Sequence, residues 1–254
     1  MNFKKDKLDV KIFETRDAMG KGAADDIAAA IKKCLSEKAE INMIFAAAPS
    51  QNDMLYHLCE RDDIEWERIN AFHMDEYIGL ASDAPQCFSN FLKRYIFDLK
   101  PFKSVNLINA GANSAEEECA RYSKLLNDFP VDIVCMGIGE NGHIAFNDPH
   151  VADFNDKALV KPVTLDDVCR MQQVNDGCFE SIDQVPTCAL TLTVPALMKA
   201  TYNFCVVPAP TKAVAVKRTV EGEINEECPA TILRLKDNAI MYCDADSSAL
   251  LEIK

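Results

Sequence analysis

The sequence predicts an α/β fold built on a doubly wound, mostly parallel sheet with helices on both faces. Short apolar runs recur along the 254 residues and alternate with longer segments whose apolar side chains repeat at helical spacing. This alternation is typical of parallel strands joined by crossover helices. In addition, three glycines lie at and just beyond the end of one apolar run, residues 131–138, where they allow a sharp turn after a buried strand.

Strands are predicted where apolar residues run together, and helices where they repeat every three or four positions. In the first long helix, for example, Ala24, Ile27, Ala28 and Ile31 fall on one face. The predicted strands are residues 9–13, 41–46, 69–74, 105–108, 131–138, 190–194, 202–207 and 239–243. The predicted helices are residues 15–35, a segment ending near 59, residues 84–99, 114–126 and 210–220, and a segment after Ser247.

The composition indicates a soluble globular protein with a single domain, residues 1–254. Hydrophobic residues make up 48% of the chain and charged residues 26%, and α/β folds of this length are commonly one domain. The apolar runs are too short to cross a bilayer, and no apolar signal segment follows the charged N-terminus. We therefore expect a cytoplasmic protein with no membrane partner.

Charge and cysteine content narrow the classes of ligand. A net charge of −13 argues against nucleic acid as a partner, because phosphate backbones are bound by basic surfaces. A local cluster of donors is still able to bind one small phosphorylated molecule. The eleven cysteines contain no C-x-x-C pair, so neither a disulfide framework nor a metal site is predicted. Whether the chain forms a homo-oligomer stays open.

Two segments carry acid-base side chains directly after predicted strands. Residues 72–80 place Asp75 at the end of a strand, where a carboxylate can serve as a general base if burial raises its pKa. Residues 137–149 place His143 between glycines, with Asp148 nearby to hydrogen-bond one ring nitrogen and fix the tautomer. Ligands of open α/β sheets bind at such strand ends, so both segments predict an active site.

Two helix starts offer groups that bind anions. Ser50 lies at the head of the helix after the second strand, and Lys212 lies in Pro-Ala-Pro-Thr-Lys-Ala at the start of another. Backbone N–H groups and the helix dipole favour negative charge at these positions. Each residue taken alone is typical of a helix cap or a solvated lysine, but together they predict a phosphate site.

The two acid-base segments resemble the signature segments of the glucosamine-6-phosphate deaminase (isomerase) family, which shares its fold with the 6-phosphogluconolactonases. The matching stretches are Met-Asp-Glu-Tyr-Ile-Gly-Leu, residues 74–80, and Gly-Glu-Asn-Gly-His-Ile-Ala-Phe-Asn-Asp-Pro, residues 139–149. Their separation matches too, and the order of strands and helices agrees along nearly the whole chain. The related lactonase segment does not continue as Ile-Ala-Phe-Asn, which favours the deaminase branch.

The resemblance implies an enzyme that opens an aminosugar phosphate, moves a proton from C2 to C1 and releases ammonia to leave a ketose phosphate. The substrate would be glucosamine 6-phosphate or a relative such as galactosamine 6-phosphate, and no metal or organic cofactor is implied. His143 would assist ring opening, Asp75 would move the C2 proton, and Asp148 would orient His143. Ser50 and Lys212 match the residues that contact the phosphate.

The chain departs from the family pattern in its phosphate loop and beside the histidine. Residues 47–50, Ala-Ala-Pro-Ser, lack the glycines of the usual loop, which alters the grip on the phosphate. Asn141 stands where the family usually has an aspartate that supports the histidine, so we expect a lower pKa for His143 than an aspartate would give. Asp148 replaces a glutamate and shortens the reach to His143 by one methylene.

The family's second basic phosphate-binding residue, an arginine, has no clear counterpart before Phe179. Arg170, from an upstream helical turn, is the predicted replacement, with Gln172 and Gln173 adding hydrogen bonds.

Two alternatives to the deaminase remain open from the sequence. One is a hydrolase of the lactonase type, in which His143 activates water and Asp75 is not needed. The other is a non-catalytic sugar-phosphate sensor, which the altered loop and Asn141 would favour.

Overall fold

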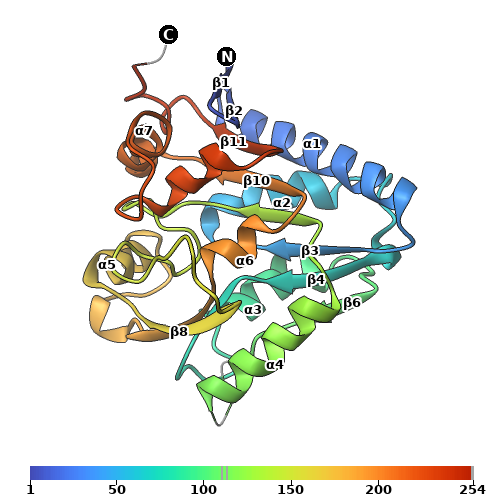
Figure 1. Cartoon of the computed structure of the whole chain (residues 1–254), viewed down its shortest axis with the longest axis vertical. Helices are drawn as coiled ribbons and strands as arrows, with labels where there is room; N and C mark the ends of the chain where they lie inside the picture. Colours follow the sequence, from blue (N-terminus) through green and yellow to red (C-terminus); the bar gives the residue numbers. More distant parts are fainter. Residues whose placement is uncertain (110, 113, 253–254) are drawn as a thin grey trace.

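A mostly parallel sheet forms the centre of the molecule (Figure 1). The computed structural model describes residues 1–109, 111–112 and 114–252. The strand order is β1-β2-β11-β10-β7-β3-β4-β6, and each neighbouring pair is parallel except β1 with β2. The predicted doubly wound, mostly parallel sheet is therefore confirmed. Its strands are β1 (Asn2–Lys5), β2 (Leu8–Ile12), β3 (Ile41–Phe45), β4 (Ile69–His73), β6 (Ser104–Asn106), β7 (Ile133–Met136), β10 (Tyr202–Val207) and β11 (Ala239–Cys243).

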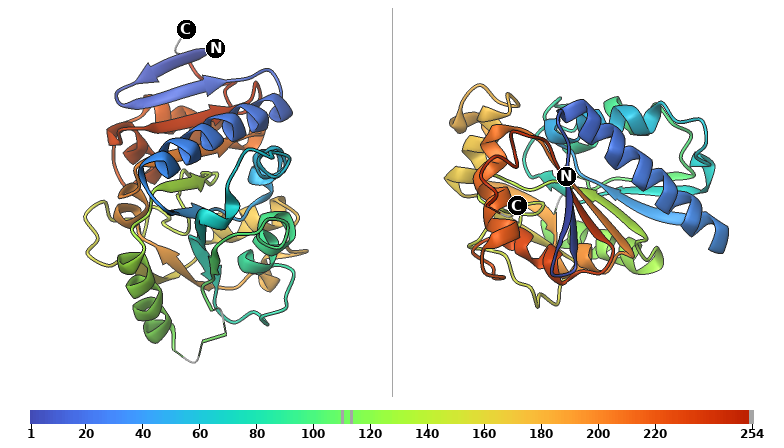
Figure 2. Two further views of the ribbon diagram at one scale, coloured as in Figure 1. Left: turned by 90° about the vertical axis from the view of Figure 1, so that its right-hand side faces the viewer. Right: turned by 90° about the horizontal axis from the view of Figure 1, so that it is seen from above.

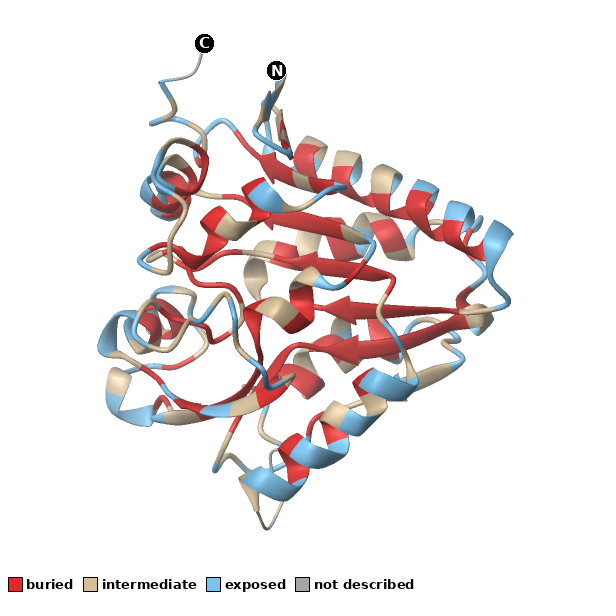
Figure 3. Ribbon diagram, viewed as in Figure 1, coloured by how far each residue is buried: buried red, intermediate tan, exposed pale blue. Residues whose placement is uncertain are grey.

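Helices cover both faces of this sheet (Figure 2). Helices α1 (Arg16–Glu37) and α2 (Asn52–Cys59) contribute to the apolar core on one face, and α4 (Ala115–Asp128), α6 (Val194–Met198) and α7 (Ala213–Glu221) contribute to the core on the other. The central strands are buried on both faces (Figure 3), as their continuous apolar sequences predict. The remaining helical segments are α3 (Phe88–Leu92), α5 (Asp167–Asn175), η1 (Pro49–Gln51), η2 (Trp66–Arg68), η3 (Lys93–Phe97), η4 (Ile182–Gln184), η5 (Pro210–Lys212) and η6 (Pro229–Leu235). Among the described residues, no helix combines the length and the apolar character needed to cross a bilayer.

A second, antiparallel sheet of three strands was not predicted. Its order is β5 (Asp75–Tyr77), β9 (Cys188–Leu192) and β8 (Val160–Thr164), so the strand predicted at 190–194 belongs here and not in the parallel sheet. The chain passes from β4 into β5 without a crossover helix, and Asp75 pairs with Thr191. Which strand pairs with β5 depends on contacts between residues more than one hundred positions apart, which no local pattern encodes.

Local side-chain hydrogen bonds explain where two helix predictions differ from the structure. The helix predicted over 84–99 is present as α3 and η3 but begins only at Phe88, where the buried Glu76 carboxylate accepts the N–H groups of Phe88 and Ser89 at 2.9 and 2.8 Å. After Ser247 there are turns instead of a helix, because Ser247 and Ser248 bond back to Asp244. Residues 253–254 of that prediction lie outside the described residues.

Candidate active site

A cleft of about 530 Å³ opens at the carboxyl ends of β10, β7, β3 and β4. These four strands are neighbours, and the order of strand addition reverses between β3 and β7: the sheet grows through β4 and β6 on one side and through β10 and β11 on the other. Open α/β sheets bind their ligands at such a switch point. The residues lining the cleft include Ala46, Ala47, Ala48 and Ser50 after β3, Met74 and Asp75 after β4, Gly137, Gly139, His143 and Phe146 after β7, and Gln172, Gln173, Asp176 and Lys212.

His143 belongs to a hydrogen-bonded network with Asn141 and Asp148. Its Nδ1 lies 2.9 Å from Asn141 Oδ1 and 2.9 Å from Asp148 Oδ1. Asn141 Oδ1 also accepts the backbone N–H of His143 at 3.0 Å, and Asn141 Nδ2 donates to Asp148 Oδ1 at 2.8 Å. Both oxygens beside Nδ1 are acceptors, so Nδ1 carries the proton and Nε2 is left to act on a ligand in the cleft.

Asp148 is fully buried, yet its surroundings favour the ionised carboxylate. Burial alone would raise the pKa of its carboxyl, but the charge of His143 and the hydrogen bonds from His143 and Asn141 outweigh burial and lower the pKa. A carboxylate in this position stabilises a proton gained by the imidazole and fixes the ring orientation. This is the geometry expected of the orienting role that the sequence suggests for Asp148.

Two glycines in the loop after β7 are required by this arrangement. A Cβ at Gly139 would overlap the imidazole ring of His143, so only glycine lets the backbone pass against the ring. Gly142 has φ +87°, a left-handed conformation that glycine adopts without the strain of a Cβ. The glycine pattern that marks this loop in the sequence therefore makes room for the histidine and turns the chain beside it.

Asp75 lines the same cleft as His143, although the two come from different strands. Its side chain is 7% exposed, and burial, with a smaller contribution from the charge of Glu76, raises the pKa of Asp75 well above its ordinary value. A carboxyl with a raised pKa is better matched to proton transfer near neutral pH. The structure thus brings together the two side chains on which the predicted chemistry depends.

The two predicted anion-binding residues also meet in this cleft. Gln51 is fully buried and donates from Nε2 to Ser50 Oγ at 3.0 Å and to the carbonyl of Val206 at 3.2 Å, which leaves the Ser50 hydroxyl proton free for a ligand. Lys212 is 4% exposed, and burial lowers the pKa of its ammonium group against the opposing charges of Asp176 and Glu140. A bound anion would compensate this desolvated charge.

Helix α5 brings Gln172 and Gln173 into the cleft but carries Arg170 away from it. The Arg170 guanidinium donates to the carbonyl of Ile182 at 2.7 Å and to that of Val185, and it does not line the cleft. Arg170 thus lies apart from Ser50 and Lys212, the other predicted phosphate contacts, which line the cleft. The carbonyl groups of Ile182 in η4 and of Val185 just after it hold the guanidinium outside the cleft.

Residues that line the cleft and were not predicted as site residues include Phe88, Phe146 and Asp176. Asp176 was the easiest of these to find, because it follows Gln172 by one helical turn and so falls on the same side of α5. Phe88 and Phe146 stack at 5.5 Å and give the cleft an apolar wall, which only the packing of distant segments creates.

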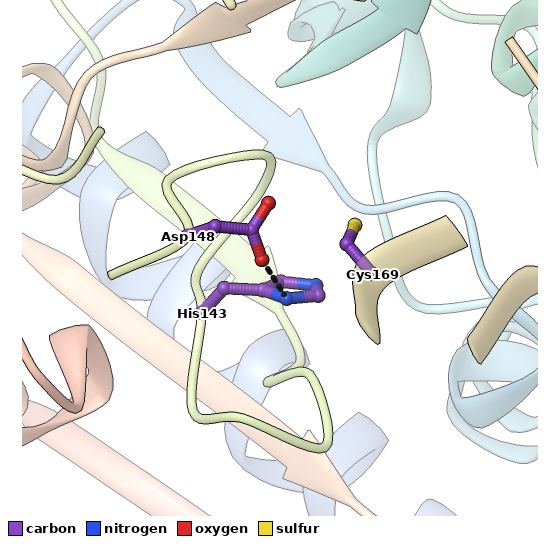
Figure 4. Close-up of side chains that lie close together, drawn as sticks. All are labelled: His143, Asp148 and Cys169. Carbon is purple, nitrogen blue, oxygen red and sulfur yellow. Dashed lines mark ion pairs between the residues drawn. The ribbon is translucent and has the colours of Figure 1, made fainter. Parts of the chain in front are cut away.

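One group of side chains has the donor set of a metal site. A ring nitrogen of His143, a carboxylate oxygen of Asp148 and the sulfur of Cys169 lie within 4.8 Å of one another, and all three residues are buried (Figure 4). Nitrogen, oxygen and sulfur donors of this kind bind zinc when the thiol is ionised. Burial, with the charge of Asp148, instead raises the pKa of the Cys169 thiol, which favours the protonated form.

Comparison with known proteins adds evidence from sequence. The family model of glucosamine-6-phosphate isomerases and 6-phosphogluconolactonases matches residues 14–242. A glucosamine-6-phosphate deaminase of Listeria innocua is 34% identical over 212 residues, which cover 84% of this chain and 88% of the relative. A glucosamine-6-phosphate deaminase of Bacillus cytotoxicus is 35% identical over 196 residues, covering 77% of this chain and 73% of the relative.

Solved structures agree with the sequence matches. A monomeric glucosamine-6-phosphate deaminase has a TM-score of 0.86 and 28% identity, with 95% of this chain and 99% of that chain covered. A 6-phosphogluconolactonase of Thermotoga maritima has a TM-score of 0.76 at 19% identity, covering 94% and 100% of the two chains. The second similarity extends to the fold alone.

Proposed function

Because the chain belongs to the family of glucosamine-6-phosphate isomerases and 6-phosphogluconolactonases, we propose that it isomerises and deaminates an aminosugar phosphate. The substrate is glucosamine 6-phosphate or a close relative such as galactosamine 6-phosphate, and the products are a ketose phosphate and ammonia. One observation carries this proposal: Asp75 and the oriented His143 line one cleft together with Ser50 and Lys212. That cleft therefore offers a base, a proton shuttle and an anion site to one small molecule.

His143 opens the sugar ring in the proposed reaction. With Nδ1 protonated and bound by Asn141 and Asp148, Nε2 accepts the proton of the O1 hydroxyl and returns it to the ring oxygen as the ring bond breaks. The adjacent carboxylate of Asp148 stabilises the imidazolium that exists between these two transfers. The open-chain aldehyde makes the C2 proton acidic.

Asp75 carries out the carbon chemistry. As a carboxylate it removes the proton from C2 while the ammonium group on C2 gives a proton to O1, which leaves an enolamine. Asp75 then returns its proton to C1, and a protonated imine remains at C2. Water adds to this imine and ammonia departs, so that the ketose phosphate remains. The raised pKa of Asp75 makes it a stronger base than an exposed aspartate, provided that it is ionised when substrate binds.

Ser50 and Lys212 hold the phosphate in the proposed complex, and Gln172 and Gln173 add polar contacts along α5. The Ala-Ala-Pro-Ser loop presents no glycine, so the grip depends on the Ser50 hydroxyl and on the buried ammonium group more than on close backbone approach. The lining of the cleft comes from residues spread between 46 and 212, so we propose that residues 1–254 act as one catalytic domain.

We also propose a cytoplasmic location and a role in amino sugar catabolism. All eleven cysteines are unpaired, which fits a reducing compartment. The reaction needs neither a metal nor an organic cofactor, because the amine and the neighbouring carbonyl already activate the C2 proton.

A substrate panel tests the proposal. The protein is incubated with glucosamine 6-phosphate, galactosamine 6-phosphate, mannosamine 6-phosphate and 6-phosphogluconolactone, and ammonia, ketose phosphate and released acid are measured. We expect ammonia and ketose phosphate in equal amounts from one hexosamine phosphate. Hydrolysis of the lactone alone would support the lactonase alternative, and binding without turnover of any compound would support a sensor.

The Asp75→Asn variant tests the mechanism with that substrate. It should lose turnover and C2 proton exchange with deuterated solvent by a factor of roughly 1,000, within the usual range for removal of a general base. Glu118→Gln is the control for removal of a buried carboxylate that does not line the cleft. Retained C2 exchange in Asp75→Asn would contradict the assignment of the base.

A further inference from the structure

The carboxylate that orients His143 uses only one of its two oxygens for that task. Asp148 Oδ1 lies 2.9 Å from His143 Nδ1 and accepts Asn141 Nδ2 at 2.8 Å. Asp148 Oδ2 is buried and has no geometrically regular hydrogen-bond partner among the described residues. A buried carboxylate oxygen without a donor is costly, so a donor close to Oδ2 would affect both the charge and the orientation of Asp148.

Cys169 is the polar side chain that approaches Asp148 from helix α5. Cys169 is completely buried, and its sulfur lies within 4.8 Å of both a carboxylate oxygen of Asp148 and a ring nitrogen of His143 (Figure 4). The thiol does not line the cleft. It is therefore placed to act on the His143–Asp148 pair without forming part of the cleft wall.

We propose that Cys169 is a positioning residue whose thiol donates its proton to Asp148 Oδ2 and so holds the carboxylate plane that orients His143. This inference rests on the proposed function, since the orientation matters for the reaction that His143 catalyses. The hydrogen bond from Cys169 would also connect α5 to His143. The same short helix contacts the cleft through Gln172 and Gln173, so movement of α5 on substrate binding would reach His143 through Cys169 and Asp148.

Two other roles for the thiol fit the structure less well. A nucleophile must reach the substrate as a thiolate, but Cys169 is not part of the cleft wall, and burial raises the pKa of its thiol. A zinc ligand must also be a thiolate, so the raised pKa of the thiol opposes zinc binding as well. Donation by a protonated thiol needs no ionisation, and the interaction of Cys169 with Asp148 acts to lower the pKa of the carboxyl.

Two variants of Cys169 separate hydrogen-bond donation to Asp148 from the packing of the side chain. Cys169→Ser keeps a donor of similar size, whereas Cys169→Ala removes it. Cys205→Ala is the matched control, because Cys205 is equally buried but lies in the sheet and outside the cleft. We expect Cys169→Ala to lower kcat about tenfold with KM within about twofold, and to shift the acid limb of the kcat profile to higher pH because the carboxylate loses a donor. Cys169→Ser and Cys205→Ala should both keep the wild-type profile.

A measurement without substrate keeps this test independent of the proposed reaction. The chain has only four histidines, so the Nδ1–H signal of His143 can be followed by nitrogen-edited NMR as the pH is lowered. In Cys169→Ala the chemical shift of this signal should change at higher pH than in the wild type, and in Cys205→Ala its pH dependence should match the wild type. The proposal is overturned if Cys169→Ala matches the wild type in this signal, if Cys169→Ser behaves like Cys169→Ala, or if the metal-free wild type binds one Zn²⁺ that Cys169→Ala does not.

Discussion

Replacing Asn141 with aspartate should shift the pH dependence of catalysis, because it sets a second carboxylate against Asp148. In the structure Asn141 Nδ2 donates to Asp148 Oδ1 at 2.8 Å, while Asn141 Oδ1 accepts from His143. An aspartate at 141 can repeat the second interaction but not the first, since an ionised carboxylate has no proton to donate. The aspartate that the family usually has at this position would therefore face Asp148 without the hydrogen bond that Asn141 donates.

The distance between the Asn141 and Asp148 side chains sets the size of the expected pKa shift. Two unit charges 2.8 Å apart repel by about 6 kcal/mol at an effective dielectric constant of about 20, which corresponds to roughly four pKa units as an upper limit. Rotation of the new side chain and the charge of His143 will absorb part of this energy. The three groups should therefore bind one more proton at neutral pH than in the wild type, with an imidazolium held between two carboxylates.

The assay is the pH profile of kcat/KM between pH 5 and 9 for the wild type and Asn141→Asp. His143 must be neutral to accept the O1 proton, so the acid limb of the variant should lie at least one pH unit higher, a shift worth about 1.4 kcal/mol. The double variant Asn141→Asp/Asp148→Asn is the matched control, because it exchanges amide and carboxylate and keeps one negative charge. The acid limb of the double variant should return toward the wild-type pH.

Thermal unfolding gives a second measurement of the same effect. An extra proton bound by the native state means that stability falls as the pH rises toward the raised pKa. The melting temperature of Asn141→Asp relative to the wild type should therefore decrease from pH 5 to pH 8. An acid limb that coincides with the wild type, together with a constant difference in melting temperature, would refute the reasoning.

Three further predictions follow from the cleft. In Gly139→Ala the new Cβ displaces the His143 ring, so kcat should fall at least a hundredfold with an unchanged far-ultraviolet circular dichroism spectrum; activity within twofold of the wild type would contradict this geometry. In Asp176→Asn the loss of a negative charge acting on Lys212 should lower KM for the phosphorylated substrate about three- to tenfold with little change in kcat, measured at two ionic strengths. A higher KM would mean that Asp176 instead accepts a hydrogen bond from the sugar. In Asp75→Asn the melting temperature should exceed that of the wild type, and the gain should grow from pH 5 to pH 8, because burial raises the pKa of Asp75 and its ionisation costs stability as the pH rises. A lower melting temperature across that range would argue against a buried, destabilising carboxylate.

Local sequence patterns determined the framework of this protein. Apolar runs such as residues 131–138 predicted the parallel sheet, and helical periodicity such as that of residues 15–35 predicted its covering helices. A strand buried on both faces needs a continuous apolar run, whereas a helix buried on one face needs apolar side chains every three or four residues. The glycines and polar residues after β7 also marked the loop that holds His143, and the acidic residues after β4 marked Asp75. Both segments end strands of one parallel sheet, so their side chains meet at one edge.

Only the tertiary structure decided how those side chains act on one another. Arg170 and Gln173 are three residues apart on one helix, yet Arg170 donates to carbonyls in and just after η4, whereas Gln173 lines the cleft. The pairing of β5 with β9 and the approach of Cys169 to Asp148 likewise join segments far apart in sequence. Hydrogen bonds, desolvation and charge act over a few ångströms in space, and the distances that set their strength exist only once the chain has folded.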